Sequence, residues 1–229
     1  GVENLRADEL IAFRVHGVRV ADVAMAKAEG LDLAPDQLVA FRIHGVTARF
    51  MKTMGESGFE NLDADKLIAF RVHGVSPAFV SDMEATGYGD LTPDQAIAFR
   101  VHNVTADFID RMEALGFERP SPDDLIALRI FDIDARFMAE MDRAGFDDLT
   151  PREAIALKIH DVDARFVRKM EALGMKRLTP YRVVAMAMLD LDEALISELS
   201  EVRYGEVDLS ILLRERSGRH YNDNHRWND

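Results

Sequence analysis

A nine-residue pattern recurs seven times along this chain, and no other feature constrains the fold as strongly. In its third copy, Leu67–Val75, the pattern reads LIAFRVHGV. The other copies are Leu10–Val18, Leu38–Val46, Ala96–Val104, Leu125–Ile133, Ala154–Val162 and Val183–Leu191. The repeats that carry these segments begin at Leu5, Leu33, Leu62, Leu91, Pro120, Leu149 and Leu178, so the period is 28 residues once and 29 thereafter. A fixed period of this length predicts a solenoid, in which each repeat buries its apolar faces by stacking on its neighbours.

Each repeat has the punctuation of two short helices. In the repeat that starts at Leu62, Asp63 is a predicted N-cap and Gly74 a predicted helix end for a first helix, helix A. Ser76 and Pro77 then begin a second helix, helix B, which ends near Gly87. No alternating strand pattern is present. We therefore predict an all-α solenoid of about seven two-helix repeats over residues 1–205, followed by a C-terminal cap helix and flexible tail over residues 206–229.

The apolar residues of helix A are spread around the helix. Leu67, Ile68, Val72 and Val75 form one predicted arc, and Phe70 points elsewhere. This distribution predicts a helix that is buried nearly all round, in a layer between its own helix B and the neighbouring repeats. In helix B, a methionine column is expected to lie in the core: Met54, Met83, Met112, Met141 and Met170.

Composition excludes several classes of function. The formal net charge is −13, which disfavours binding to nucleic acid or to an anionic membrane surface. Cysteine is absent, so disulfides and thiolate metal sites are excluded. No apolar run approaches the ~18 residues of a membrane span. No glycine-rich phosphate loop or nucleophile motif is present, and we expect no enzyme activity and no cofactor.

A basic residue occupies the same position of helix A in six repeats, and we predict these residues as the candidate partner-binding site: Arg14, Arg42, Arg71, Arg100, Arg129 and Lys158. One interpretation is a structural ladder between these residues and acids near the start of helix A in neighbouring repeats. Those acids are Asp8, Asp36, Asp65, Asp94 and Asp123. The functional interpretation is a row of cations that grips carboxylates of a protein or peptide partner along a groove. Binding of phosphate or nucleic acid is a third interpretation.

A histidine column follows the basic column: His16, His44, His73, His102 and His160. Equivalent atoms on stacked helices lie about 8–10 Å apart, which is too far for a shared metal ion. We therefore predict histidines that are bonded to a backbone carbonyl or to an acid, with a pH-sensitive element and a metal site as the alternatives. His220, His225, Asp223 and Asp229 near the C-terminus are a further metal candidate.

The repeat LTPDQAIAFRVHNVTADFIDRMEALGF at Leu91–Phe117 resembles short helical repeats of bacterial proteins. It is similar to those that follow the membrane zinc-peptidase domain in sensors of the beta-lactam-sensing antirepressor type. The resemblance covers residues 1–200 and implies a recognition segment, extracytoplasmic (periplasmic) if the resemblance holds and cytoplasmic otherwise. The zinc motif of that family is absent, so no peptidase activity is implied. The start LTPDQ also resembles the repeats of TAL effectors, but those repeats are longer and basic.

Together these observations predict a non-enzymatic scaffold for protein or peptide recognition. The alternatives are a ligand-sensing segment of a membrane peptidase and a purely structural spacer. Gly1–Leu5 matches Gly58–Leu62, the junction between two repeats, so we expect the sequence to be a piece of a longer protein. A spacer would have its arginines fully paired with acids. A scaffold would leave several arginines or Phe70-type rings exposed.

Overall fold

The computed structural model describes residues 5–189, and these residues form thirteen α-helices and no strand. The first helix of each repeat (helix A) has the bounds α1 Ala7–His16, α3 Pro35–His44, α5 Ala64–His73, α7 Pro93–Val101, α9 Pro122–Ile130, α11 Pro151–Ile159 and α13 Pro180–Met188. The second helix (helix B) has the bounds α2 Val20–Ala28, α4 Ala48–Glu56, α6 Pro77–Ala85, α8 Ala106–Ala114, α10 Ala135–Asp142 and α12 Ala164–Ala172. The predicted all-α repeat solenoid is confirmed.

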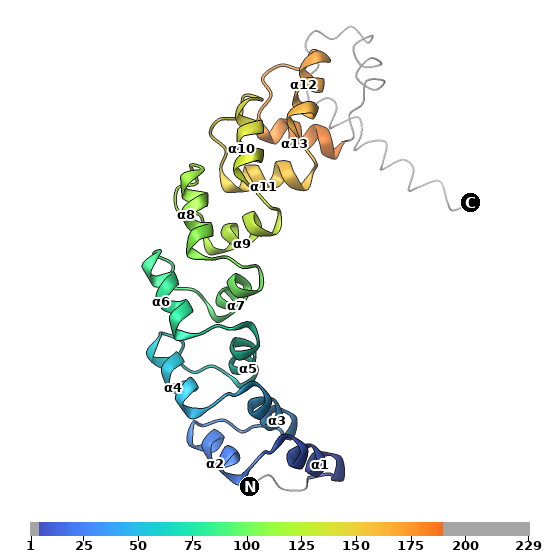
Figure 1. Cartoon of the computed structure of the whole chain (residues 1–229). Helices are drawn as coiled ribbons and strands as arrows, with labels where there is room; N and C mark the ends of the chain where they lie inside the picture. Colours follow the sequence, from blue (N-terminus) through green and yellow to red (C-terminus); the bar gives the residue numbers. More distant parts are fainter. Residues whose placement is uncertain (1–4, 190–229) are drawn as a thin grey trace, which may run out of the picture. The chain divides into compact units, whose positions relative to one another are not determined.

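The chain divides into two compact bodies, which we describe separately. Among the described residues, the N-terminal body contains 5–112 and 121–126, and the C-terminal body contains 113–120 and 127–189. In the N-terminal body, α1 packs on α3, α3 on α5 and α5 on α7. These helices A form one layer, and the helices B form a second layer beside it (Figure 1). In the C-terminal body, α11 packs on α13 in the same way.

The helix ends follow the predicted local chemistry. Thr92 accepts a hydrogen bond from the backbone N–H of Gln95, and the Gln95 side chain accepts one from the backbone N–H of Thr92. Such a capping box satisfies two N–H groups that the helix leaves unpaired. At the other end, the helix A stop is left-handed whether the residue is Gly74, with φ 73°, or Asn103, with φ 55°. A proline at the first helical position, as in α3, α7 and α11, and a left-handed residue just beyond the helix mark the two ends of helix A.

The core lies between the two layers and between successive repeats. Leu67 and Phe70 of α5 are 3% and 0% exposed. The Phe70 ring meets the ring of Phe59, which precedes α5, edge to face at a centroid distance of 5.0 Å. Full burial of such a ring contributes about 1.5–3 kcal/mol. All five methionines of the predicted core column are buried, which confirms that prediction: Met54, Met83, Met112, Met141 and Met170.

The first repeat shows what burial by a neighbour contributes. Leu10 is 54% exposed, whereas Leu38 and Leu67, at the same position of the next two repeats, are 1% and 3% exposed. No residue of α1 is buried. Because α1 has no preceding helix A among the described residues, its stacking face is open.

The sequence also predicts a continuation of the last helix B over Leu191–Arg203, a further helix over Val207–Arg214 and a loose tail over Ser217–Asp229. These three predictions, and the metal candidate near the C-terminus, lie outside the described residues. Within residues 5–189, no helix combines the length and the apolar character that a membrane crossing requires.

Candidate binding surface

Arg71 and Arg100 of the basic column bind groups within the solenoid and not the predicted acids. The Nε of Arg71 donates a hydrogen bond of 2.9 Å to the backbone carbonyl of His44, at the end of helix A in the preceding repeat. Its guanidinium carbon also lies 5.0 Å from the centre of the Phe50 ring on helix B of that repeat. Arg100 repeats both contacts one step along the chain. Its Nε lies 3.3 Å from the carbonyl oxygen of His73, and its guanidinium carbon lies 5.5 Å from the Phe79 ring.

The physical reason is the chemistry of a helix end. The last carbonyls of helix A have no intrahelical donor and carry the negative end of the helix dipole, so a guanidinium group is a favourable partner. The aromatic face below adds a cation–π contact. Gly45 admits this approach, because a Cβ at Gly45 would lie 3.0 Å from the guanidinium of Arg71.

The predicted ladder between arginines and acids is therefore wrong for Arg71 and Arg100. Three of the acids are instead bound by the third residue of the preceding helix A. The side-chain amide of Gln37 donates to Asp65 at 2.9 Å, that of Gln95 donates to Asp123 at 3.0 Å, and Lys66 forms an ion pair with Asp94. These contacts lie at the N-terminal ends of the helices A, away from the arginines. The prediction failed because several polar residues of one repeat can reach the next, and only the helix orientation selects among them.

The other four residues of the basic column do not share one environment. In the C-terminal body, the amino group of Lys158 lies 5.0 Å from the centre of the Phe137 ring, so a lysine keeps the cation–π contact there. Arg129 is half-buried. Arg14 and Arg42 are exposed. That these six residues bind a partner stays a prediction, but Arg71 and Arg100 already make contacts that stabilise the fold.

A small cavity of about 210 Å³ lies between the first two hairpins. Its lining includes Arg19, Asp22 and Arg42. Asp22 occupies the helix B position that Phe50 and Phe79 occupy in the next two repeats. The guanidinium group of Arg42 therefore has no ring below it, and the missing aromatic volume accounts for the cavity.

The histidine column does not form a polar network in the first three repeats. His16, His44 and His73 are exposed, and their imidazoles have no hydrogen-bond partner among residues 5–189. The predicted structural bonding is therefore wrong for these three residues. No group of three or more His, Asp or Glu side chains in the described part of the chain is placed to hold a metal ion.

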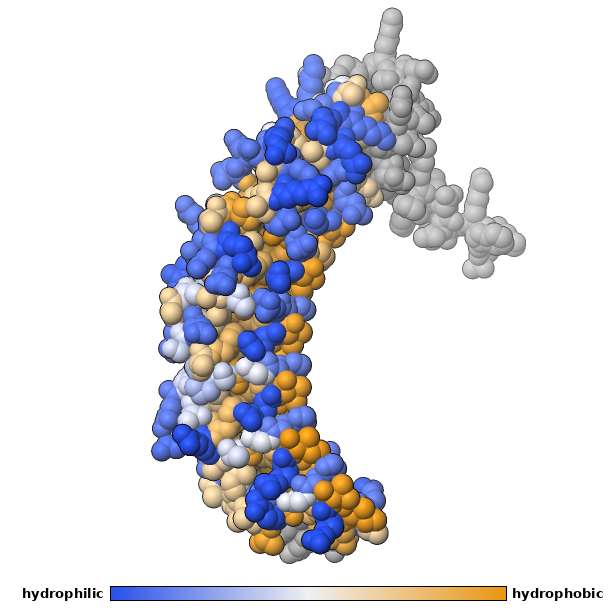
Figure 2. All heavy atoms as spheres, viewed as in Figure 1, coloured by the Kyte–Doolittle hydropathy of each residue, from blue (hydrophilic) through white to orange (hydrophobic). Residues whose placement is uncertain are grey.

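The most regular exposed feature is apolar. The residue after each arginine is aliphatic, and in the N-terminal body these residues form what we call the aliphatic column: Val15, Ile43, Val72 and Val101. Their exposed fractions are 70%, 54%, 51% and 51%. Figure 2 shows apolar side chains gathered along the row of α1, α3, α5 and α7. Single exposed aliphatic residues are common on soluble proteins, but a column in register across packed helices forms a continuous patch of the kind that marks an interaction site.

A row of acids runs beside the aliphatic column. We call it the acidic edge: Asp8, Asp36, Asp65 and Asp94. Asp65 and Val72 are seven residues apart, so they point about 20° apart around the helix and lie about 10 Å apart along its axis. The exposed face of each helix A is thus acidic at its N-terminal end and aliphatic further along.

Sequence reasoning predicted that helix A is buried nearly all round, with Val72 in its main apolar arc, and this is wrong for the face that carries Val72. Phe70 is fully buried and Val72 is half-exposed. The sequence does contain a signal that distinguishes the two faces. Because an aspartate is rarely buried, Asp65 marks the exposed side of the helix, and Val72 shares that side.

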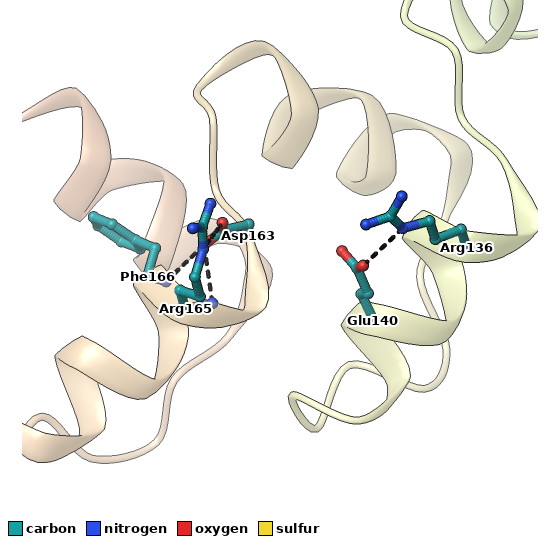
Figure 3. Close-up of polar contacts among 5 residues, drawn as sticks. All are labelled: Arg136, Glu140, Asp163, Arg165 and Phe166. Carbon is teal, nitrogen blue, oxygen red and sulfur yellow. Dashed lines mark hydrogen bonds and ion pairs between the residues drawn. The ribbon is translucent and has the colours of Figure 1, made fainter.

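Exposed charged pairs on helices B stabilise local structure. In the C-terminal body, Asp163 accepts hydrogen bonds from the backbone N–H groups of Arg165 and Phe166, and it pairs with the Arg165 side chain at 2.8 Å. Arg136 pairs with Glu140 one turn along α10 (Figure 3). Partial burial opposes ionisation of Asp163, but the hydrogen bonds from Phe166 and Arg165 outweigh it and hold the pKa of Asp163 below its ordinary value. Asp163 and the backbone N–H groups that it binds therefore form a helix cap.

The aliphatic column and the acidic edge therefore form the best-defined candidate surface on the described residues. Comparison with known proteins adds no further constraint, because no protein-family model, no curated protein and no solved structure matches this chain.

Proposed function

We propose that this protein is a non-enzymatic scaffold that binds a peptide or protein segment along the exposed face of its helix A layer. The observation that carries the proposal is the aliphatic column, in which each residue is at least half exposed on four successive helices A of one body. Each residue removed from water by a partner would gain about 25 cal/mol per Å² of apolar surface. The gain repeats at every helix, so affinity grows with the number of repeats that the partner crosses.

The geometry also favours a binding role for this face over a purely structural one. The interior of the stack is already filled by residues such as Leu67 and Phe70, so the valine at position 72 is not needed to complete it. A serine or threonine at position 72 would be compatible with the same packing. An aliphatic residue nevertheless occupies this position in six of the seven repeats, and Met188 occupies it in the seventh.

The experiment is selection of peptides from a random phage-displayed library on the full chain. Binding of the selected peptides is then measured to two matched variants. The first, Val72→Glu with Val101→Glu, adds two charges to the aliphatic column. The second, Ala78→Glu with Ala85→Glu, adds two charges to exposed positions of α6.

We expect the first variant to lose at least tenfold in affinity and the second to bind as the wild type does. Circular dichroism checks that both variants keep their helix content. Selected peptides that bind the Val72→Glu, Val101→Glu variant as well as the wild type would refute the proposal.

A further inference from the structure

We propose that the aliphatic column and the acidic edge together bind an extended, basic peptide that carries an apolar side chain at every third position. The inference rests on the proposed function and specifies the chemistry of the partner. It follows from two properties of the N-terminal body: the spacing of the column and the charge beside it.

The spacing of the column selects among peptide conformations. Axes of packed helices are about 8–10 Å apart, so successive residues of the column are separated by about this distance. A polyproline II chain presents the same side every third residue, at about 9.3 Å. An α-helix returns to the same side after seven residues, at about 10.5 Å, and a β-strand does so after two residues, at about 6.6 Å. The polyproline II chain alone falls within the range, so one apolar side chain can meet each helix A without losing register.

The charges beside the column determine which residues suit the other positions of the peptide. Asp36 has no hydrogen-bond or ion-pair partner among residues 5–189, and Asp65 is bound only by the neutral amide of Gln37. Both carboxylates therefore remain unneutralised. Asp8 and Asp94 are paired with Arg6 and Lys66. A lysine or arginine next to each apolar residue of the peptide can reach the acidic edge, about 10 Å from the column along the helix axis.

Beside Val72 and Val101, the opposite edge does not demand a charge from the peptide. There the guanidinium groups of Arg71 and Arg100 are already bonded to the carbonyls of His44 and His73. The formal charge of −13 on the whole chain also repels an acidic partner. The third position of each triplet is therefore neutral, and proline there favours the polyproline II conformation.

The test uses four synthetic peptides and the full chain, with affinity measured by fluorescence anisotropy at low salt. The first peptide is four copies of Leu-Lys-Pro. The second has the same composition, reordered so that no two leucines are three positions apart. The third is four copies of Leu-Glu-Pro, and the fourth is a heptad-patterned helical peptide with the same numbers of leucine and lysine.

We expect the Leu-Lys-Pro peptide to bind at least tenfold more tightly than each of the other three. Its affinity should fall at least fivefold with Asp36→Asn and Asp65→Asn together, and added salt should reduce this difference. The matched control, Asp82→Asn with Asp107→Asn, removes two exposed charges from helices B and should leave affinity unchanged. Equal or tighter binding by the reordered, acidic or helical peptide would overturn the inference. Equal losses in the two pairs of aspartate variants, or no binding by the Leu-Lys-Pro peptide, would overturn it as well.

Failure of this inference can be distinguished from failure of the proposed function. Library-selected peptides that require the aliphatic column but are acidic or helical would leave the scaffold function standing and refute the extended basic ligand. Selected peptides that do not require the column would refute both.

Discussion

At the scale of single residues, the same amino acid has different energetic weight in different repeats. Leu67 is 3% exposed and Leu10, at the equivalent position, is 54% exposed. We expect Leu67→Ala to lower the free energy of unfolding by about 3 kcal/mol, because it leaves a cavity in a packed core. Leu10→Ala should cost less than about 1 kcal/mol, because half of that side chain is already in water. Urea denaturation of the two variants measures the difference, and equal losses would show that the first repeat is buried as fully as the third.

Asp163 gives a prediction about pH. The pKa of its carboxyl is lowered in the folded protein, so its stabilising effect is present above its unfolded pKa and is lost as pH falls through the folded pKa. We expect Asp163→Asn to lower stability by about 0.5 kcal/mol near neutral pH, because Asn still caps the helix but lacks the charge. The difference from the wild type should vanish between about pH 5 and about pH 2.

Denaturation midpoints measured across this pH range test the prediction. Asp110→Asn is the matched control, because it removes an exposed carboxylate from α8 that has no partner among residues 5–189. A loss at Asp163 that stays constant down to the lowest pH would contradict a role for its charge.

At the scale of helices, the contact that the sequence missed is the one that joins successive hairpins. Arg71 links the end of α3 and the Phe50 ring of α4 to the next repeat. We expect Arg71→Ala to cost about 1–2 kcal/mol, the sum of a charge-assisted hydrogen bond and an exposed cation–π contact. Arg71→Lys should cost less, because Lys158 makes the same ring contact in a later repeat.

The matched control for this prediction is Arg49→Ala, which removes an exposed arginine from α4 that has no partner in the described part of the chain. Its effect should stay within about 0.5 kcal/mol. Thermal denaturation compares the three variants, and an effect of Arg71→Ala no larger than that of Arg49→Ala would show that the contact to the His44 carbonyl contributes nothing.

Helix positions were the most predictable part of the fold. Thr92, Ser76 and Gly74 mark helix ends through local chemistry, a hydroxyl that accepts a backbone N–H or a residue that tolerates positive φ. Such signals depend only on residues three or four apart, so they can be read without the fold. The partner of Arg71 lies 27 residues away, and no local rule identifies it.

At the scale of the whole molecule, stability depends on stacking between neighbours. In such an array it is approximately a sum of repeat and interface contributions. We expect a copy of residues 33–57, added ahead of Gly1, to bury Leu10 and Phe13 and to raise the urea midpoint. The m-value should rise too, because more surface is exposed on unfolding. A copy with serines at its core positions is the control, and an equal midpoint for both extended proteins would refute stacking on the open face of α1.

Only part of the candidate surface could be predicted from the sequence. The basic column was found at once because charge in register is easy to see, yet Arg71 and Arg100 turn out to hold repeats together. The aliphatic column was overlooked because valine is usually buried, and its exposure follows from the neighbours of each helix.

The sequence by itself determined the period, the two-helix repeat, the helix ends and the methionine core, because these depend on local caps and on 3.6-residue periodicity. Only the tertiary structure decided which side of helix A faces the neighbours and which atoms accept the arginines. Helix A is apolar on both sides, so its apolar pattern alone leaves two orientations open. The packed neighbours select the one that buries Phe70 and leaves Val72 in water, because a ring loses more than a valine does when it stays exposed.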